Sequence, residues 1–194
     1  SHILPGIDDG AKDIEDSKFL MEQMISFGFH KSIATPHTLT NIWNNNPTTI
    51  NDAFEKTKKE LPQLSSQLSL KAASEYILDE NFLDLIKEKK ILPLKENIVL
   101  VEMSYINPPI QLFDIIFEMR VAGYTPVLAH PERYLFYHNN FETYQKLKKA
   151  GCYFQLNLLS TVGYYGKPVT IAAEKLLKNN MIDFVGSDFH HKNH

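Results

Sequence analysis

Apolar residues recur with two different spacings along the chain, and the order of these segments predicts an α/β protein. Over residues 13–28 they are three or four residues apart, as on one face of a helix, and Gly28 ends the pattern. Residues 98–101 are continuously apolar, as in a buried strand, and residues 1–4 resemble the end of another. The same reasoning predicts helices over 13–28, 47–61, 81–89, 109–121, 141–150 and 168–178, and further strands over 29–35, 70–74, 125–129, 153–156 and 182–186.

Residues with reactive side chains stand at the C-terminal end of each predicted strand, and most are of types that bind metals. They are His2, His37, Glu75, Glu102, His130, Asn157 and Asp188. From His2 to Asp188 there are six intervals between successive residues of this set, and they average about 31 residues, the length of one strand–helix unit. Seven such units close most naturally into a parallel barrel, in which the C-terminal ends of the strands converge on one face. We therefore expect these side chains to meet in space.

The candidate ligands combine imidazoles with carboxylates. Glu75 and Glu102 each end an apolar run, and a buried carboxylate without a partner costs several kcal/mol, so a cation should compensate them. Eight ligands without thiolates suit two or three ions of Zn²⁺, Mn²⁺ or Fe. Taken singly, His130 could be a structural histidine, and the Asp8-Asp9 pair could belong to a turn. The full set is His2, Asp9, His37, Glu75, Glu102, His130, Asp188 and His190.

Composition narrows the class of protein. The chain of 194 residues is 43% hydrophobic and 22% charged, as expected for one compact domain over residues 1–194. The net charge of -3 and the dispersed basic residues argue against a nucleic-acid partner. The single cysteine, Cys152, allows no internal disulfide, and no apolar run reaches the roughly 18 residues of a membrane span. We expect a cytoplasmic protein without membrane insertion.

Arg133 is the candidate for binding phosphate. It is one of only two arginines in the chain and follows His130 by three residues. A planar guanidinium could hold two phosphate oxygens beside metal ions that supply a hydroxide and clamp a phosphoryl group. The alternative is a surface ion pair with Glu132 or a neighbour.

Four motifs resemble the bacterial polymerase and histidinol phosphatase (PHP) superfamily. They are His-Ile-Leu-Pro-Gly-Ile-Asp-Asp-Gly-Ala at residues 2–11, Thr-Pro-His at 35–37, Ala-His-Pro-Glu-Arg-Tyr at 129–134 and Gly-Ser-Asp-Phe-His at 186–190. Within it, the chain most resembles the manganese-dependent protein-tyrosine phosphatases of capsule and exopolysaccharide gene clusters. The resemblance implies a distorted (β/α)7 barrel, a trinuclear metal site at the strand ends, and hydrolysis of phosphotyrosine by a metal-activated hydroxide. It also implies a tyrosine autokinase as the phosphoprotein partner.

The resemblance further implies roles for individual residues. His2, Glu75 and Asp188 would bind a first metal, Asp9, His37 and His190 a second, and Glu75, Glu102 and His130 a third. Arg133 would contact the substrate phosphate, and with Asp188 and His190 would form the catalytic set. The family pattern begins Asp-x-His-x-His, and its first histidine, a ligand of the first metal, has no counterpart here, so we expect the domain to begin before Ser1. Family members also usually continue for a few helices past the Asp-x-His motif, so we expect it to extend beyond His194 as well.

Two alternative functions stay open, and two catalytic mechanisms are excluded. The runner-up is a small-molecule phosphatase acting on histidinol phosphate or nucleotides, and the other alternative is a noncatalytic metal-barrel binding protein. A cysteine-dependent phosphatase needs an arginine six residues after its cysteine, where this chain has Leu158, and no Walker nucleotide-binding motif is present. Aromatic candidates for contact with a substrate ring are Tyr134, Phe136, Tyr164 and Tyr165.

Overall fold

The computed structural model describes residues 1–192, and the chain divides into two compact units. The first unit contains residues 1–75 and 90–94 and the segment that begins at Asp188. The second contains residues 76–89 and 95–187. The candidate ligands and Arg133 are distributed over both units, and each unit is described by itself.

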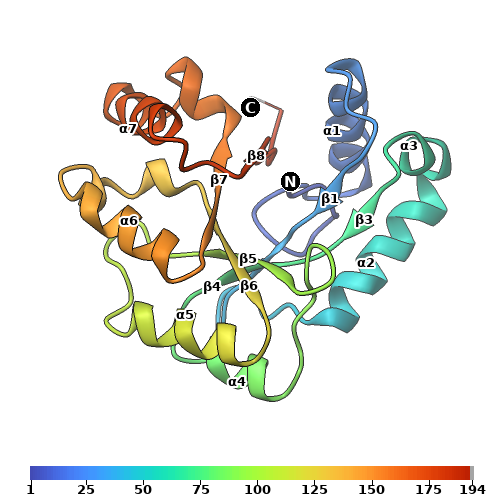
Figure 1. Ribbon diagram of the computed structural model, residues 1–194. Helices are drawn as coiled ribbons and strands as arrows, with labels where there is room; N and C mark the ends of the chain where they lie inside the picture. The colour runs from blue at the N-terminus through green and yellow to red at the C-terminus, as the bar shows by residue number, and fades with distance from the viewer. Residues whose placement is uncertain (193–194) are drawn as a thin grey trace. The chain divides into compact units, whose positions relative to one another are not determined.

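The first unit is mainly helical, with one short parallel strand pair. Strands β1 and β3 pair in parallel, with Ile33 opposite Lys71, and Figure 1 draws the two strands beside each other. Ile3, Leu4, Leu20, Met21 and Ile50 are fully buried in the core. The elements are α1 (Ile14–Ser26), β1 (Ile33–Ala34), β2 (His37–Thr38), α2 (Pro47–Glu60), α3 (Pro62–Gln67) and β3 (Lys71–Ala72).

The two long helices of this unit begin where the sequence predicts. The side chain of Asp13 accepts a hydrogen bond from the backbone N–H of Asp16 at the start of α1. Asn46 and Thr49 form a capping box at the start of α2, with Pro47 in the first turn. These caps satisfy backbone N–H groups that have no partner within the helix. Both predicted helices are therefore confirmed.

The second unit alternates strands and helices. Strands β5, β6, β7 and β8 lie side by side in that order and pair in parallel, with Leu100 opposite Val127 and Leu128 opposite Phe154. The helices α5, α6 and α7 lie on the chain between successive strands of this set, as can be followed in Figure 1. The elements are β4 (Glu75–Ile77, which starts at the unit boundary), α4 (Phe82–Lys87), β5 (Ile98–Glu102), α5 (Leu112–Val121), β6 (Thr125–Ala129), η1 (Pro131–Arg133), η2 (Leu135–Tyr137), α6 (Phe141–Lys149), β7 (Tyr153–Asn157), η3 (Leu158–Val162), α7 (Lys167–Lys178) and β8 (Phe184–Gly186).

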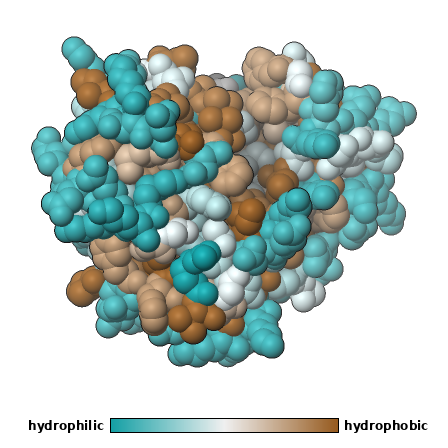
Figure 2. All heavy atoms as spheres, in the orientation of Figure 1, coloured by the Kyte–Doolittle hydropathy of each residue, from teal (hydrophilic) through white to brown (hydrophobic). Residues whose placement is uncertain are grey.

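The surface mixes polar and apolar residues, and no described helix is a membrane span. Figure 2 shows apolar residues between the charged ones, including the region where Figure 1 draws α5. Phe113, Phe117 and Val121, four residues apart on α5, are exposed. Within residues 1–192 no helix has the length and apolar character needed to cross a bilayer.

The structure confirms the α/β class with parallel strands and corrects several elements. Residues 1–3 form no strand, and the strand expected over 29–35 is reduced to Ile33–Ala34. β4 and α3 were not predicted; Pro62 begins α3 after Leu61 ends α2. Barrel closure and the single domain over residues 1–194 stay predictions.

Candidate metal centre

His2 lies in the first unit and is held by backbone contacts on both sides. Its N–H donates to the carbonyl of Phe189 at 2.8 Å, and its carbonyl accepts from the N–H of Ala11 at 2.9 Å. A Cβ on Gly10 would lie 2.0 Å from the His2 carbonyl oxygen, so only glycine permits this close approach. The imidazole, 0% exposed, is thereby fixed inside the unit.

Asp8 orients this imidazole. Its Oδ2 lies 2.7 Å from His2 Nδ1 and also accepts the backbone N–H of His37 at 3.1 Å. Its Oδ1 accepts the N–H of Gly10 at 3.0 Å. Because a carboxylate at Nδ1 draws the proton there, Nε2 of the neutral ring carries the lone pair. From the sequence, Asp9 of the Asp8-Asp9 pair is expected to bind metal. The sequence does not predict that the buried Asp8 side chain orients the His2 ring.

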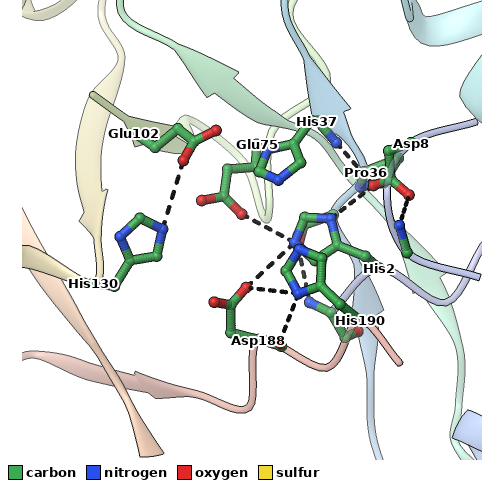
Figure 3. A network of polar contacts seen from close by, with 12 residues as sticks. His2, Asp8, Pro36, His37, Glu75, Glu102, His130, Asp188 and His190 are labelled. Carbon is green, nitrogen blue, oxygen red and sulfur yellow. Dashed lines mark hydrogen bonds and ion pairs between the residues drawn. The ribbon is translucent and has the colours of Figure 1, made fainter. Parts of the chain in front are cut away.

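The Nε2 atom of His2 faces two buried carboxylates. It lies 3.4 Å from Glu75 Oε2 and 3.4 Å from Asp188 Oδ1, as Figure 3 shows. Within residues 1–192 this nitrogen has no hydrogen-bond partner. Ligand atoms of the three residues all lie within 4.8 Å of one another. A buried imidazole and two carboxylates form a donor set that suits a divalent cation.

The charge balance of this group also fits a cation. Burial opposes a proton charge on His2, but the surrounding carboxylates, Asp188 first, outweigh it and raise the pKa of the imidazole well above its ordinary value. Burial likewise opposes the ionised form of Asp8, yet its hydrogen bond with His2 lowers the pKa of that carboxyl. The cluster therefore favours positive charge at its centre, which a metal ion would supply.

A second group in the same unit contains His2, Asp9, His37 and His190, with ligand atoms within 4.8 Å of one another. Asp9 Oδ1 lies 3.6 Å from His37 Nε2 and 3.7 Å from His190 Nε2. His190 Nδ1 donates to the carbonyl of Asp188 at 2.8 Å, and the ring stacks on His2 at 3.8 Å. Burial, and then the charge on His2, lower the pKa of His190 to about 3, so this ring is neutral at neutral pH.

Asp188 and His190 lie in the loop that follows β8. The two side chains do not follow the alternation of a strand, because β8 ends at Gly186 and Asp188 has a φ of 50°. This left-handed residue ends the extended backbone. Asp188 and His190 therefore both lie near His2 without belonging to a strand.

Glu102 and His130 come together in the second unit. Glu102 ends β5, and His130 directly follows the neighbouring parallel strand β6, so the two strand ends are adjacent as predicted. His130 Nε2 lies 3.7 Å from Glu102 Oε2, and both residues are buried. By contrast, His37 and Glu75 begin the strands β2 and β4, so the expectation that they end strands is wrong.

Arg133, also in the second unit, is the last residue of the 3-10 helix η1, and its guanidinium lies near two aromatic rings. The central carbon of its guanidinium is 4.8 Å from the ring centre of Tyr105 and 4.2 Å from that of Tyr165. Glu132 is fully buried, and its Oε1 accepts from the N–H of Asn157 and the hydroxyl of Ser160. A surface ion pair between Arg133 and Glu132 is therefore wrong. The sequence reasoning missed Tyr105.

The other aromatic candidates and the cysteine are placed as follows. Tyr134 is 0% exposed, so it cannot face a substrate, and its hydroxyl accepts the N–H of Met103 at 2.9 Å. Phe136 is half-buried and Tyr164 is exposed. Burial raises the pKa of the Cys152 thiol to about 12, which agrees with the interpretation of this residue as inert.

The chain is similar to several known proteins over almost its whole length. It is 30% identical over 190 residues to the tyrosine-protein phosphatase YwqE of Bacillus subtilis, covering 97% of this chain and 75% of that protein. It is 26% identical to the tyrosine-protein phosphatase CpsB of Streptococcus pneumoniae, covering 98% of this chain and 81% of that protein.

A solved structure agrees with the sequence comparisons. It comes from a crystallographic study of YwqE and CpsB, which that study describes as unique metal-dependent tyrosine phosphatases. The match has a TM-score of 0.91 at 28% identity and covers 98% of this chain and 78% of the other. The pattern of one family, described as capsular polysaccharide synthesis, CpsB/CapC, matches residues 1–194. The resemblance to capsule-type phosphatases is confirmed, and the chain belongs to the CpsB/CapC family.

Proposed function

We propose that this protein is a metal-dependent protein-tyrosine phosphatase that hydrolyses phosphotyrosine on a protein of capsular or exopolysaccharide synthesis. The observation that carries the proposal is the buried Nε2 of His2, directed at Glu75 and Asp188 and without a hydrogen-bond partner in residues 1–192. Family membership supplies the reaction class. The phosphoprotein partner we propose is a tyrosine autokinase, and the compartment is the cytoplasm.

We group the proposed ligands by which side chains lie close together within each unit. His2, Glu75 and Asp188 would hold one ion, and Asp9, His37 and His190 a second. Glu102 and His130 of the second unit would supply a carboxylate and an imidazole for a third. The donors, which are nitrogen and oxygen without thiolates, suit Zn²⁺, Mn²⁺ or Fe. We propose two or three ions, with Mn²⁺ the best candidate because the chain resembles the manganese-dependent phosphatases. We also propose that the strands close into a distorted (β/α)7 barrel.

Several side chains of the protein have separate roles in the proposed catalysis. If bound here, divalent ions would provide a hydroxide at neutral pH and would offset the charge of a phosphoryl group. Asp8 fixes the His2 ring, so that Nε2 remains directed into the site. Arg133 would bind phosphate oxygens through its planar guanidinium, and Asp188 and His190 complete the proposed catalytic set.

Metal removal tests this proposal. The protein is treated with a chelator, dialysed, and assayed on a phosphotyrosyl peptide and on histidinol phosphate before and after addition of Mn²⁺. We expect chelation to abolish hydrolysis of the peptide and Mn²⁺ to restore it, since no side-chain nucleophile is part of the proposed site. Full activity after complete metal removal would contradict the proposal. Faster turnover of histidinol phosphate than of the peptide would instead favour a small-molecule phosphatase.

A further inference from the structure

Two tyrosines hold the one arginine that is proposed to bind phosphate. Tyr105 follows β5 and Tyr165 follows η3, so the two rings reach Arg133 from separate segments of the second unit. The guanidinium carbon lies 4.8 Å and 4.2 Å from their ring centres. Both distances are within the range of a cation–π interaction, in which the face of the ring attracts the cation. We call Tyr105 and Tyr165 the aromatic cradle.

The Tyr165 side of the cradle is fixed by a buried hydrogen-bond network. The side-chain amide of Asn157 donates to the Tyr165 hydroxyl at 3.0 Å, and its carbonyl oxygen accepts the N–H of Leu159 at 2.9 Å. The N–H of Asn157 donates in turn to Glu132 Oε1 at 2.9 Å. Glu132 directly precedes Arg133, so the network joins the turn that carries the arginine to the ring that contacts it.

The Tyr105 side is fixed by ring packing. Tyr105 stacks on His130, with ring centres 5.6 Å apart, and lies 5.8 Å from the ring of Tyr134. Tyr134 is completely buried and accepts the N–H of Met103, two residues before Tyr105. Tyr105 itself is 46% exposed, so it meets solvent while its position is set by buried neighbours. Aromatic pairs at these separations stabilise their mutual arrangement.

We propose that Tyr105 and Tyr165 are positioning residues that hold the Arg133 guanidinium in the orientation required to bind phosphate. An arginine has several rotatable bonds, and its side-chain entropy must be lost when it engages a ligand. The cradle restricts the guanidinium before the ligand arrives, which lowers that cost. This inference rests on the proposed phosphate-binding role of Arg133, and it assigns the tyrosines a part distinct from contact with the substrate ring.

The test compares leucine and phenylalanine variants in the metal-loaded protein. Tyr105→Leu and Tyr165→Leu remove the ring, whereas Tyr105→Phe and Tyr165→Phe keep it. The measurements are KM and kcat for a phosphotyrosyl peptide, Ki for inorganic phosphate, and bound metal. Tyr153→Leu is the matched control. Tyr153 is also a partly exposed tyrosine beside a cationic side chain, that of Lys148, but it lies at the end of β7 opposite to Asn157.

We expect each leucine variant to raise both KM and the Ki of phosphate by about threefold to tenfold, with a smaller change in kcat. The control Tyr153→Leu should stay near the parent values, and metal content should not change. Each phenylalanine variant should raise KM and Ki less than the leucine variant at the same position, because it keeps the ring, although Tyr165→Phe also loses the hydrogen bond from Asn157. In an Arg133→Ala background, the leucine substitutions should have no further effect, because they act through the arginine.

Three outcomes would overturn the inference. A higher KM with an unchanged Ki would mean that the rings touch the substrate ring, which inorganic phosphate lacks. A fall in bound metal in Tyr105→Leu would mean that this ring acts on His130. No change in the leucine variants, while Arg133→Ala raises Ki, would mean that the arginine needs no cradle. If Arg133→Ala itself leaves Ki unchanged, the phosphate role fails, and that result is distinguishable from the others.

Discussion

At the scale of single residues, Asp8 controls the best-defined part of the site. Its Oδ2 contacts Nδ1 of the His2 ring and accepts a hydrogen bond from the His37 N–H. Its Oδ1 accepts a hydrogen bond from the Gly10 N–H. Each of these bonds fixes a group that is part of, or borders, the proposed metal centre. A carboxylate behind a ligating histidine sets the orientation and basicity of the ring.

Replacing Asp8 should therefore weaken metal binding without deleting any ligand. We expect Asp8→Asn to lower the affinity for Mn²⁺ by about 10-fold to 100-fold, because an amide cannot hold the His2 Nδ1 proton as strongly as a carboxylate. Titration of the metal-free protein measures this directly. Asp52→Asn, on the exposed surface of α2, is the control and should bind like the parent. Equal affinities for both variants would contradict the assigned role.

Cys152 provides a prediction about reactivity. Because burial raises the pKa of its thiol to about 12, the reactive thiolate is scarce in the folded protein at ordinary pH. We expect iodoacetamide to leave the native protein unmodified up to about pH 9 and to modify it after unfolding. Cys152→Ser should retain phosphatase activity. Rapid alkylation of the native chain with parallel loss of activity would show that the thiol takes part in the reaction.

The residues that could be predicted from sequence are those whose chemical type is unusual for their place. Carboxylates and imidazoles after apolar runs are conspicuous, and this pointed to Glu102, His130 and His190. Asp8 and Tyr105 could not be assigned in this way, because an acidic residue in a turn and a tyrosine in a loop are common. Their roles depend on distances to segments far away in the sequence, which no local pattern contains.

At the scale of elements, the loop from His2 to Ala11 depends on Gly10. A Cβ on residue 10 would lie only 2.0 Å from the His2 carbonyl oxygen, and this oxygen belongs to the backbone, which cannot move aside cheaply. We expect Gly10→Ala to destabilise the protein by about 1–3 kcal/mol, as overpacking does, and to reduce metal binding by displacing His2. Thermal unfolding and metal titration measure the two effects.

Gly186→Ala is a useful comparison for this variant. Its added Cβ would also be close to another group, 2.6 Å from Gln155 Nε2, but that atom is the end of a flexible side chain. We expect a smaller loss of stability, since the glutamine can adopt another rotamer. If both variants lose the same stability, the clash with the His2 carbonyl is not what requires glycine at position 10.

The elements also show why some strands could be predicted and others could not. β5, β6 and β7 have five residues each and are mainly apolar, so the sequence indicates them as strands. β1 and β2 have two residues each, too few for any periodicity to appear. The loop at Asp188 contains one left-handed residue. Aspartate adopts this conformation more often than most residues do, but it is still uncommon, so the sequence alone does not indicate it.

At the scale of the whole molecule, the proposed metal centre connects binding with folding. In the first unit, Glu75 and Asp188 are buried on either side of the His2 nitrogen, and their charges repel one another unless a cation or a proton lies between them. A divalent ion that binds only the folded chain stabilises it by mass action. Metal should therefore change the unfolding temperature as well as the activity.

We expect Mn²⁺ at 100 times its Kd to stabilise the metal-free protein by about 2.7 kcal/mol, which corresponds to a rise in Tm of about 5–11 °C for a chain of this size. Glu75→Gln should lose most of this response, because the amide provides a weaker ligand and no charge to compensate. Glu80→Gln, an exposed glutamate in the same region of the chain, should keep the full response. Since unfolding temperature is measured without substrate, the result separates metal binding from catalysis: a Glu75→Gln protein that responds to Mn²⁺ as strongly as Glu80→Gln would remove Glu75 from the proposed ligands, whatever the activity of either variant.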